Sequence, residues 1–144
     1  MRERLRRVYV GLLAPAVVVF VAAYIVQARH VIDVKPILRR YPALAPAIFL
    51  SAALCGIALP ILFRTLFVYE HRGRQRIGEM ELFTFERKTL VSALLTPYLA
   101  IAAAFLGVPK ILFAGTVLSM FYAVYYFYPS KKRIAFEKRI FRVK

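Results

Sequence analysis

The side chains that could carry out chemistry gather in residues 68–86, VYEHRGRQRIGEMELFTFE. This stretch holds four of the chain's seven acidic residues and one of its two histidines. A histidine beside a carboxylate can act as a general base, and two carboxylates can divide the acid and base roles in a suitable pocket. An extended backbone would put Glu79 and Glu81 on one face. One hypothesis is therefore an enzyme working at a membrane surface, with His71, Glu70, Glu79 and Glu81 as its candidate residues.

A simpler interpretation is that residues 69–88 form a solvated loop between two apolar segments. A metal site needs converging ligands, and the second histidine, His30, lies far away in the sequence. Glu70 and Arg74 are four residues apart, a spacing that forms ion pairs on a helix. The chain contains no nucleophile elbow, phosphate-binding loop or dinucleotide motif, and its single cysteine cannot form an intrachain disulfide. We therefore predict no catalytic residue, no metal and no cofactor.

The composition indicates a membrane protein. The 144 residues are 61% hydrophobic, with a mean hydropathy of +0.63, whereas soluble domains are nearer about 45–50% apolar. A soluble chain of this length could not bury so much apolar surface. The formal charge of +15 raises nucleic acid as a partner. However, basic residues that flank apolar runs are typical of membrane proteins, so we expect no nucleic-acid binding.

Four apolar runs should position everything else. They cover residues of about 8–26, 43–63, 89–106 and 111–128, and each is long enough to cross a bilayer as a helix. The first run is too long for a signal-peptide core, so we expect an uncleaved helix. We predict an all-α integral membrane protein with one domain over residues 1–144. Its four transmembrane helices would form two antiparallel hairpins, followed by a cytoplasmic tail over 129–144.

The basic residues predict the orientation of these helices. Seventeen of the 22 lysines and arginines precede the first run, lie between the second and third, or follow the fourth. Only five lie in the two remaining connections. The excess of positive charge marks the cytoplasmic side, so both termini and the middle loop should be cytoplasmic. The short loops and the Arg/Ala/Leu-rich composition favour a prokaryotic cytoplasmic (inner) membrane.

The interior of the runs is poor in charge and rich in small residues. No ionisable side chain lies deep in any run, which argues against a proton-coupled pump but not against a passive pore or transport of an apolar molecule. Prolines at positions 15, 46, 60 and 97 could kink the helices. Small residues spaced by four let helices approach closely, within the chain or with a partner. These candidate packing residues are Ser51, Ala52, Cys55, Gly56, Ala100, Ala104, Gly115 and Ser119.

The end of the fourth run and the tail offer contact surfaces. Tyr122, Tyr125, Tyr126 and Tyr128 are typical of an aromatic belt at the headgroup level, and could also bind a ligand or a neighbouring subunit. The tail SKKRIAFEKRIFRVK predicts a basic amphipathic helix that lies on anionic lipids or docks on a partner. The candidate surface residues, including those of the middle loop, are Arg72, Arg74, Arg76, Lys131, Lys132, Arg133, Lys138, Arg139 and Arg142.

These features favour a non-catalytic membrane subunit or accessory protein. It would pack against a larger membrane complex or against itself, and it would contact anionic lipids at the cytoplasmic leaflet. The alternative is a small transporter or a protein that handles a lipid or another hydrophobic ligand, and it could act as a homodimer. The two differ in one structural feature, since a transporter needs a polar cavity that reaches the middle of the membrane.

Overall fold

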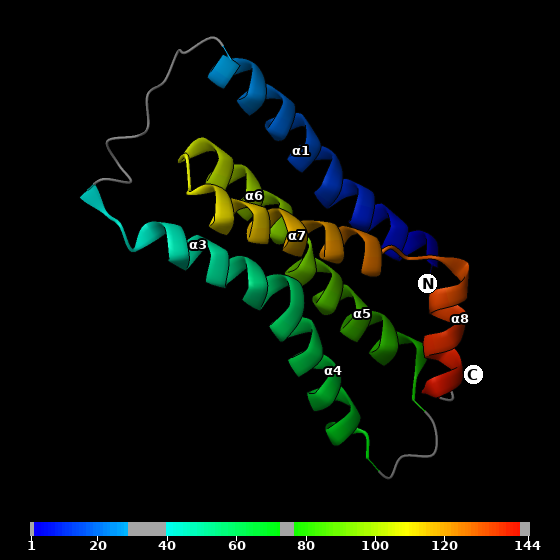
Figure 1. The fold of residues 1–144 in the computed structure, drawn as a ribbon. Helices are drawn as coiled ribbons and strands as arrows, with labels where there is room; N and C mark the ends of the chain where they lie inside the picture. The colour runs from blue at the N-terminus through cyan, green and yellow to red at the C-terminus, as the bar shows by residue number, and fades with distance from the viewer. Residues whose placement is uncertain (1, 29–39, 73–76, 142–144) are drawn as a thin grey trace.

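The computed structural model describes residues 2–28, 40–72 and 77–141, and all regular structure in these ranges is helical (Figure 1). The all-α prediction is therefore confirmed. Three stretches are long and apolar enough to cross a membrane: Arg2–Ala23, Leu44–Glu70 and Glu79–Phe105. There is a fourth candidate span if the helices Lys110–Tyr126 and Lys131–Ile140, which are bent by 76° relative to each other, are counted as one. The helices are α1 (Arg2–Ala28), α3 (Leu44–Ala53), the π-helical turn η1 (Leu54–Ala58), α4 (Leu59–Glu70), α5 (Glu79–Ala93), α6 (Thr96–Phe105), α7 (Lys110–Tyr126) and α8 (Lys131–Ile140).

The helices extend beyond the apolar runs. The predicted loop over residues 69–88 is wrong for its second half, because α5 begins at Glu79. Hydropathy marks only the apolar part of a helix, whereas the first turns of α5 are amphipathic and bury Leu82 and Phe85. Acidic residues in a first turn also complement the helix dipole.

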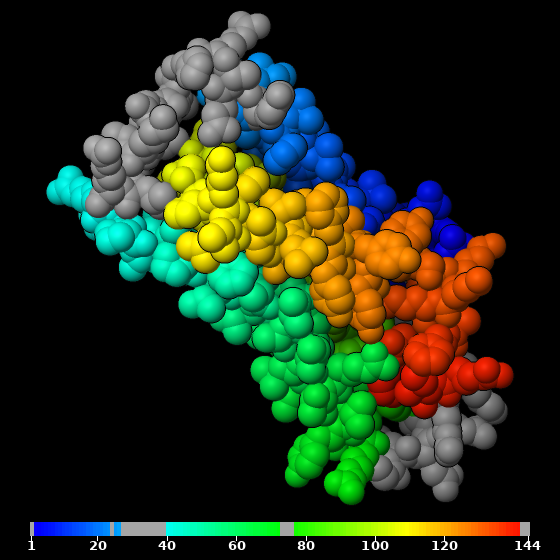
Figure 2. Space-filling view, viewed as in Figure 1, coloured from blue at the N-terminus to red at the C-terminus, as the bar shows by residue number. Residues whose placement is uncertain are grey.

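The bundle is built around α6 and α7. Helices α1 and α3 lie on opposite sides of this pair in Figure 1, and α3 contacts both of them. The α4 and α5 helices pack together beyond η1, and α8 lies beside them at the same end (Figure 2). Four of the buried apolar residues that join α1, α5, α7 and α8 into one cluster are Leu5, Leu90, Phe127 and Ile134.

A tight turn connects α6 to α7. Gly107 has a φ of 65°, in the left-handed region that costs glycine least. Its N–H donates to the carbonyl of Ala104 at 3.3 Å, and the N–H of Val108 donates to the carbonyl of Ala103 at 3.1 Å. These two bonds form a Schellman motif, which ends α6 with its last carbonyls satisfied.

The π-helical turn exposes one carbonyl that another helix satisfies. The N–H of Leu59 donates to Leu54, five residues back, and Pro60 has no N–H to offer. The carbonyl of Cys55 therefore loses its usual backbone donors. The hydroxyl of Ser92 on α5 donates to it at 3.3 Å. This bond ties α5 to the turn at the depth where water is scarce.

Replacing Ser92 with alanine should remove this tie. The buried carbonyl of Cys55 would lose its donor, so we expect a loss of about 1 kcal/mol in the free energy of unfolding. Thermal unfolding in detergent, followed by circular dichroism, measures the effect. Thr65→Ala is the control, because the Thr65 hydroxyl bonds only to the carbonyl of Ile61 within its own helix, at an exposed position. Equal stability of the two variants would contradict the role given to Ser92.

Helix α8 has an inner and an outer face. Ile134, Glu137 and the following Phe141 are buried against the bundle, whereas Phe136 and Ile140 are 57% and 45% exposed. The tail is thus helical over Lys131–Ile140, but its described apolar residues do not share one flank as the sequence suggested. The inner face is occupied by the chain's own α4, α5 and α7, and only the outer face is left for lipid or a partner.

Candidate functional site

Charged residues meet where α4 ends, α5 begins and α8 crosses them, and we call this region the charged end of the bundle. The guanidinium of Arg133 donates from Nη2 to Glu86 Oε2 at 2.7 Å. Arg64 Nη1 lies 3.3 Å from Glu137 Oε1. Three helices are therefore joined by two ion pairs, with α8 contributing one member to each.

The acidic partners of these pairs are buried. Glu86 and Glu137 are only 4% and 5% exposed. A buried carboxylate is tolerated when an opposite charge and hydrogen bonds replace its water. The Phe127 ring lies 5.0 Å below the guanidinium of Arg133, which adds a cation–π contact. If either Glu86 or Arg133 were removed, the other would remain as an unpaired charge in an apolar setting.

Local sequence places α8 for this role. The side chain of Ser130 accepts a hydrogen bond from the backbone N–H of Arg133 at 3.1 Å and so caps the helix. Arg133 and Glu137 are four residues apart, hence on one face of α8, and Ile134 lies next to that face. Farther along, Lys138 pairs with Glu79 of α5 at 2.7 Å on the exposed side.

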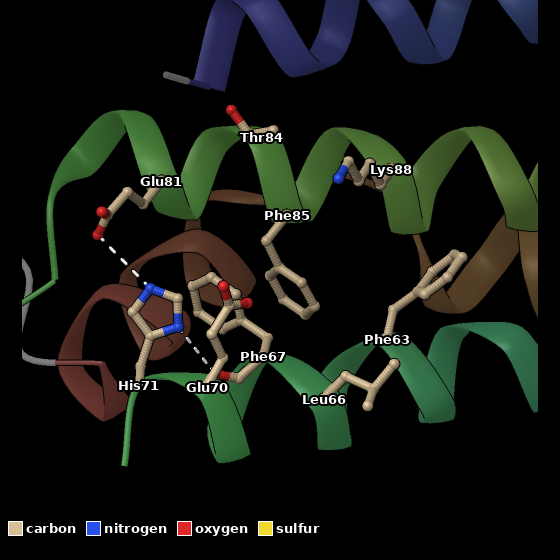
Figure 3. Close-up of a pocket in the computed structure, with 9 residues that line it drawn as sticks. All are labelled: Phe63, Leu66, Phe67, Glu70, His71, Glu81, Thr84, Phe85 and Lys88. Carbon is tan, nitrogen blue, oxygen red and sulfur yellow. Dashed lines mark hydrogen bonds and ion pairs between the residues drawn. The ribbon is translucent and has the colours of Figure 1, made fainter. Parts of the chain in front are cut away.

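A groove of about 540 Å³ lies between α4 and α5, and we call it the histidine groove (Figure 3). Its lining residues are Phe63, Leu66, Phe67, Glu70, His71, Glu81, Thr84, Phe85 and Lys88. His71 Nδ1 is 2.9 Å from the carbonyl of Phe67, and Nε2 is 3.6 Å from Glu81 Oε2. A carbonyl only accepts, so Nδ1 carries a proton and Nε2 is the nitrogen that faces the carboxylate.

The structure brings only part of the predicted catalytic set together. His71 and Glu81 are neighbours, and Glu70 lines the same groove. Glu79 lies elsewhere, paired with Lys138, so the prediction that Glu79 and Glu81 share a face is wrong. In a helix, residues two positions apart are separated by about 200° around the axis, whereas in an extended strand they lie on the same side.

The contact between His71 and Glu81 joins the end of α4 to the start of α5. Glu81 Oε2 also accepts the backbone N–H of Gly78 at 3.3 Å, which helps to start α5. The same side chain thus caps α5 and contacts the residue that ends α4. Within residues 2–28, 40–72 and 77–141, no group of three or more His, Cys, Asp or Glu side chains could hold a metal ion. His30 lies outside these ranges.

A second groove opens between α7 and α8, and we call it the tyrosine groove. It has a volume of about 680 Å³. A smaller cavity of about 60 Å³ adjoins it and shares four of its lining residues, Arg64, Tyr126, Arg133 and Glu137. The other residues of the tyrosine groove are Tyr125, Tyr128, Ser130, Lys132 and Phe136.

The predicted basic surface divides into paired and exposed residues. Arg133 and Lys138 form ion pairs with α5. Four others are exposed, namely Arg72, Lys131, Lys132 and Arg139. Arg74, Arg76 and Arg142 lie outside the described residues, as does the predicted pairing of Glu70 with Arg74.

The predicted tyrosines surround the end of α7. Tyr125 is 87% exposed, and the rings of Tyr122 and Tyr126 stack with centroids 5.2 Å apart. Tyr128 meets Tyr9 of α1 edge to face at 5.4 Å. The tyrosines therefore form a partly exposed rim around the charged end, and two of them pack on each other.

The predicted packing residues lie largely inside the chain. Ala52, Gly56, Ala100 and Ser119 are buried, and Ser51, Cys55, Ala104 and Gly115 are half-buried. A Cβ built on Gly56 would lie 3.0 Å from Thr96 Oγ1, and one on Gly115 would lie 2.5 Å from the ring of Phe49. These contacts join η1 to α6, and α3 to α7, without a second chain.

Sequence reasoning missed Glu86, Glu137 and Arg64 as members of one site. A usable signal was present for Glu86, an acid placed directly before an apolar run, where an unpaired charge would be costly.

Comparison of the chain with protein-family models, curated proteins and solved structures finds no match.

Proposed function

We propose that the chain is a non-catalytic accessory subunit of a membrane assembly, docked on another membrane protein or on a second copy. Its four spans would form two antiparallel hairpins, with both termini and the middle loop in the cytoplasm of a prokaryote. The excess of lysine and arginine in those segments supports this orientation. The charged end of the bundle would then lie at the cytoplasmic surface.

Close packing in the middle of the bundle is the observation that carries this proposal. A Cβ added to Gly56 would lie 3.0 Å from Thr96 Oγ1 and 3.4 Å from the carbonyl of Ser119, so η1, α6 and α7 are in close contact there. Thr96 and Thr116 are fully buried, and the hydroxyls of Thr116 and Ser119 bond to carbonyls of their own helix. In a transporter such hydroxyls would line a passage, whereas here they lie in the contacts between helices. This favours a packed structural unit over a conduit.

The charged end also favours binding over catalysis. Its two buried acids are engaged by arginines, and His71 lies between a carbonyl and Glu81. Side chains committed to holding helices together are poorly placed to transfer protons to a substrate. The outer faces of α7 and α8, with exposed Leu118, Phe121 and Phe136, remain available for contact.

The native mass of the complex tests the proposal. The tagged full chain is extracted from its own membrane with a mild polymer that retains lipid, and its mass is measured by native mass spectrometry. We expect a particle heavier than the 16.5 kDa chain, containing other chains or further copies. A strictly monomeric chain in its native membrane patch would contradict the proposal.

A hydrophobic-ligand protein is the second candidate, and one apolar groove favours it. This groove of about 240 Å³ lies between α1, α6 and α7, lined by residues such as Leu13, Val17, Ile101 and Phe121. A lipid chain or an isoprenoid would fit its chemistry. The same extraction decides between the candidates, because only this function predicts that the extracted particle retains one defined hydrophobic molecule.

A further inference from the structure

The tyrosine groove combines three cations with an aromatic rim. Arg64 comes from α4, and Lys132 and Arg133 come from the first turn of α8. Tyr125, exposed over most of its surface, and Phe136 lie at its edges. Helices far apart in the sequence thus place positive charge and aromatic rings around one opening. Such a combination suits a ligand with an anionic group attached to an apolar part.

The cations of the groove differ in how much of their capacity is free. Lys132 is exposed and makes no ion pair with any described residue. Arg64 uses Nη1 for Glu137, and its side chain is still 39% exposed. A guanidinium has several N–H donors, so one ion pair leaves others for a phosphate. Among the described lining residues the only carboxylate is that of Glu137, which is buried. Its Oε1 faces Arg64, and its Oε2 has no hydrogen-bond partner among the described residues.

The surroundings of the groove are those expected of a site at the depth of lipid headgroups. The next turns of the chain toward the apolar middle carry Ile57 and Ile61 on one side and Leu118 and Tyr122 on the other, all of them exposed. Ile57, Ile61 and Tyr122 line the smaller cavity that adjoins the groove. Tyrosine and tryptophan concentrate at the membrane interface, and apolar residues follow them toward the hydrocarbon core. A phosphate in the groove would therefore have acyl chains beside these apolar side chains.

We propose that the tyrosine groove binds the headgroup phosphate of an anionic phospholipid, with Lys132 and the free donors of Arg64 as its ligands. Arg133 adds positive charge, but its Nη2 already donates to Glu86 and its Nη1 to the carbonyl of Tyr126. The inference rests on the membrane orientation assumed under the proposed function, but not on the existence of a protein partner. It assigns the lipid a defined position, in place of a general attraction to the basic surface.

Lipid retention by matched variants tests the site. The full chain and the variants Lys132→Ala and Lys131→Ala are equilibrated with equal amounts of phosphatidylglycerol and phosphatidylcholine, and bound lipid is counted by native mass spectrometry. Both variants lose one exposed charge at adjacent positions of α8, but only Lys132 lines the groove. One basic group near an anionic headgroup contributes about 1 kcal/mol, so Lys132→Ala should weaken phosphatidylglycerol binding about fivefold. Lys131→Ala should change it much less.

Two results would overturn this inference. Equal losses in both variants would show attraction to surface charge in general. Displacement of the phosphatidylglycerol by millimolar inorganic phosphate would show a site for a soluble anion. Melting temperatures equal to that of the parent chain verify that both variants are folded. A monomer that still retains the lipid in the Lys132-dependent manner would contradict the accessory-subunit proposal while leaving the lipid site intact.

Discussion

Replacing Glu86 with alanine is expected to destabilise the protein and release α8 from the bundle. The change leaves the guanidinium of Arg133, only 17% exposed, above the ring of Phe127 without its counter-ion. Removing one member of a buried ion pair typically costs about 3–5 kcal/mol, because the remaining charge is desolvated and unpaired. We therefore expect a loss of about 3 kcal/mol in the free energy of unfolding.

Thermal unfolding in detergent, followed by circular dichroism, gives the size of the loss. Proteolysis then reports whether α8 has separated, since trypsin cleaves after the basic residues of this helix once the helix leaves the bundle and unfolds. Glu79→Ala is the matched control, because it removes an acid that pairs α5 with α8 at the exposed surface. Exposed pairs add little to stability, so the control should melt with the parent chain.

The double variant Glu86→Ala/Arg133→Ala separates the ion pair from the burial of each group. When both charges are absent, no unpaired charge remains, so the double variant should be more stable than Glu86→Ala alone. A Glu86→Ala variant as stable as Glu79→Ala would mean that Arg133 finds water or another partner, and that the charged end does not hold α8.

The sequence predicted the elements of the fold better than their limits. Apolar runs long enough to cross a bilayer identified the helices, because every backbone group in lipid must bond within its own helix. They did not show that α5 begins at Glu79, since its first turns are amphipathic and the mean hydropathy there is low. The π-helical turn at Leu54–Ala58 was likewise missed.

The charged end could not be assembled from the sequence. Glu86 and Arg133 are 47 positions apart, and their pairing depends on the bend of 76° between α7 and α8. No local pattern predicts that angle. The spacing of four between Arg133 and Glu137 was visible, but the two point to different helices, so reading them as one surface pair would have failed. Small residues were easier, since their spacing alone suggested helix contacts that the structure places at Gly56 and Gly115.

Replacing Gly56 with leucine should separate the helices in the middle of the bundle. The first added carbon would lie 3.0 Å from Thr96 Oγ1 and 3.4 Å from the backbone carbonyl of Ser119, so the Thr96 side chain must give way even before the rest of the leucine is placed. Overpacking a close contact costs about 1–3 kcal/mol, and leucine adds three further carbons. We expect a loss at or above the top of that range, measured by thermal unfolding in detergent.

Gly11→Leu is the matched control for this change. Gly11 also lies in a helix, and a Cβ added there meets no atom within 4 Å. Both substitutions gain helix propensity, by somewhat less than the about 0.8–1 kcal/mol that separates glycine from alanine. The difference between the variants therefore isolates the contact with Thr96 and Ser119. If Gly56→Leu is as stable as Gly11→Leu but no longer joins its complex, the small residues around Gly56 face a partner. If it loses stability as expected, they close the centre of the bundle, and the partner must dock on another face.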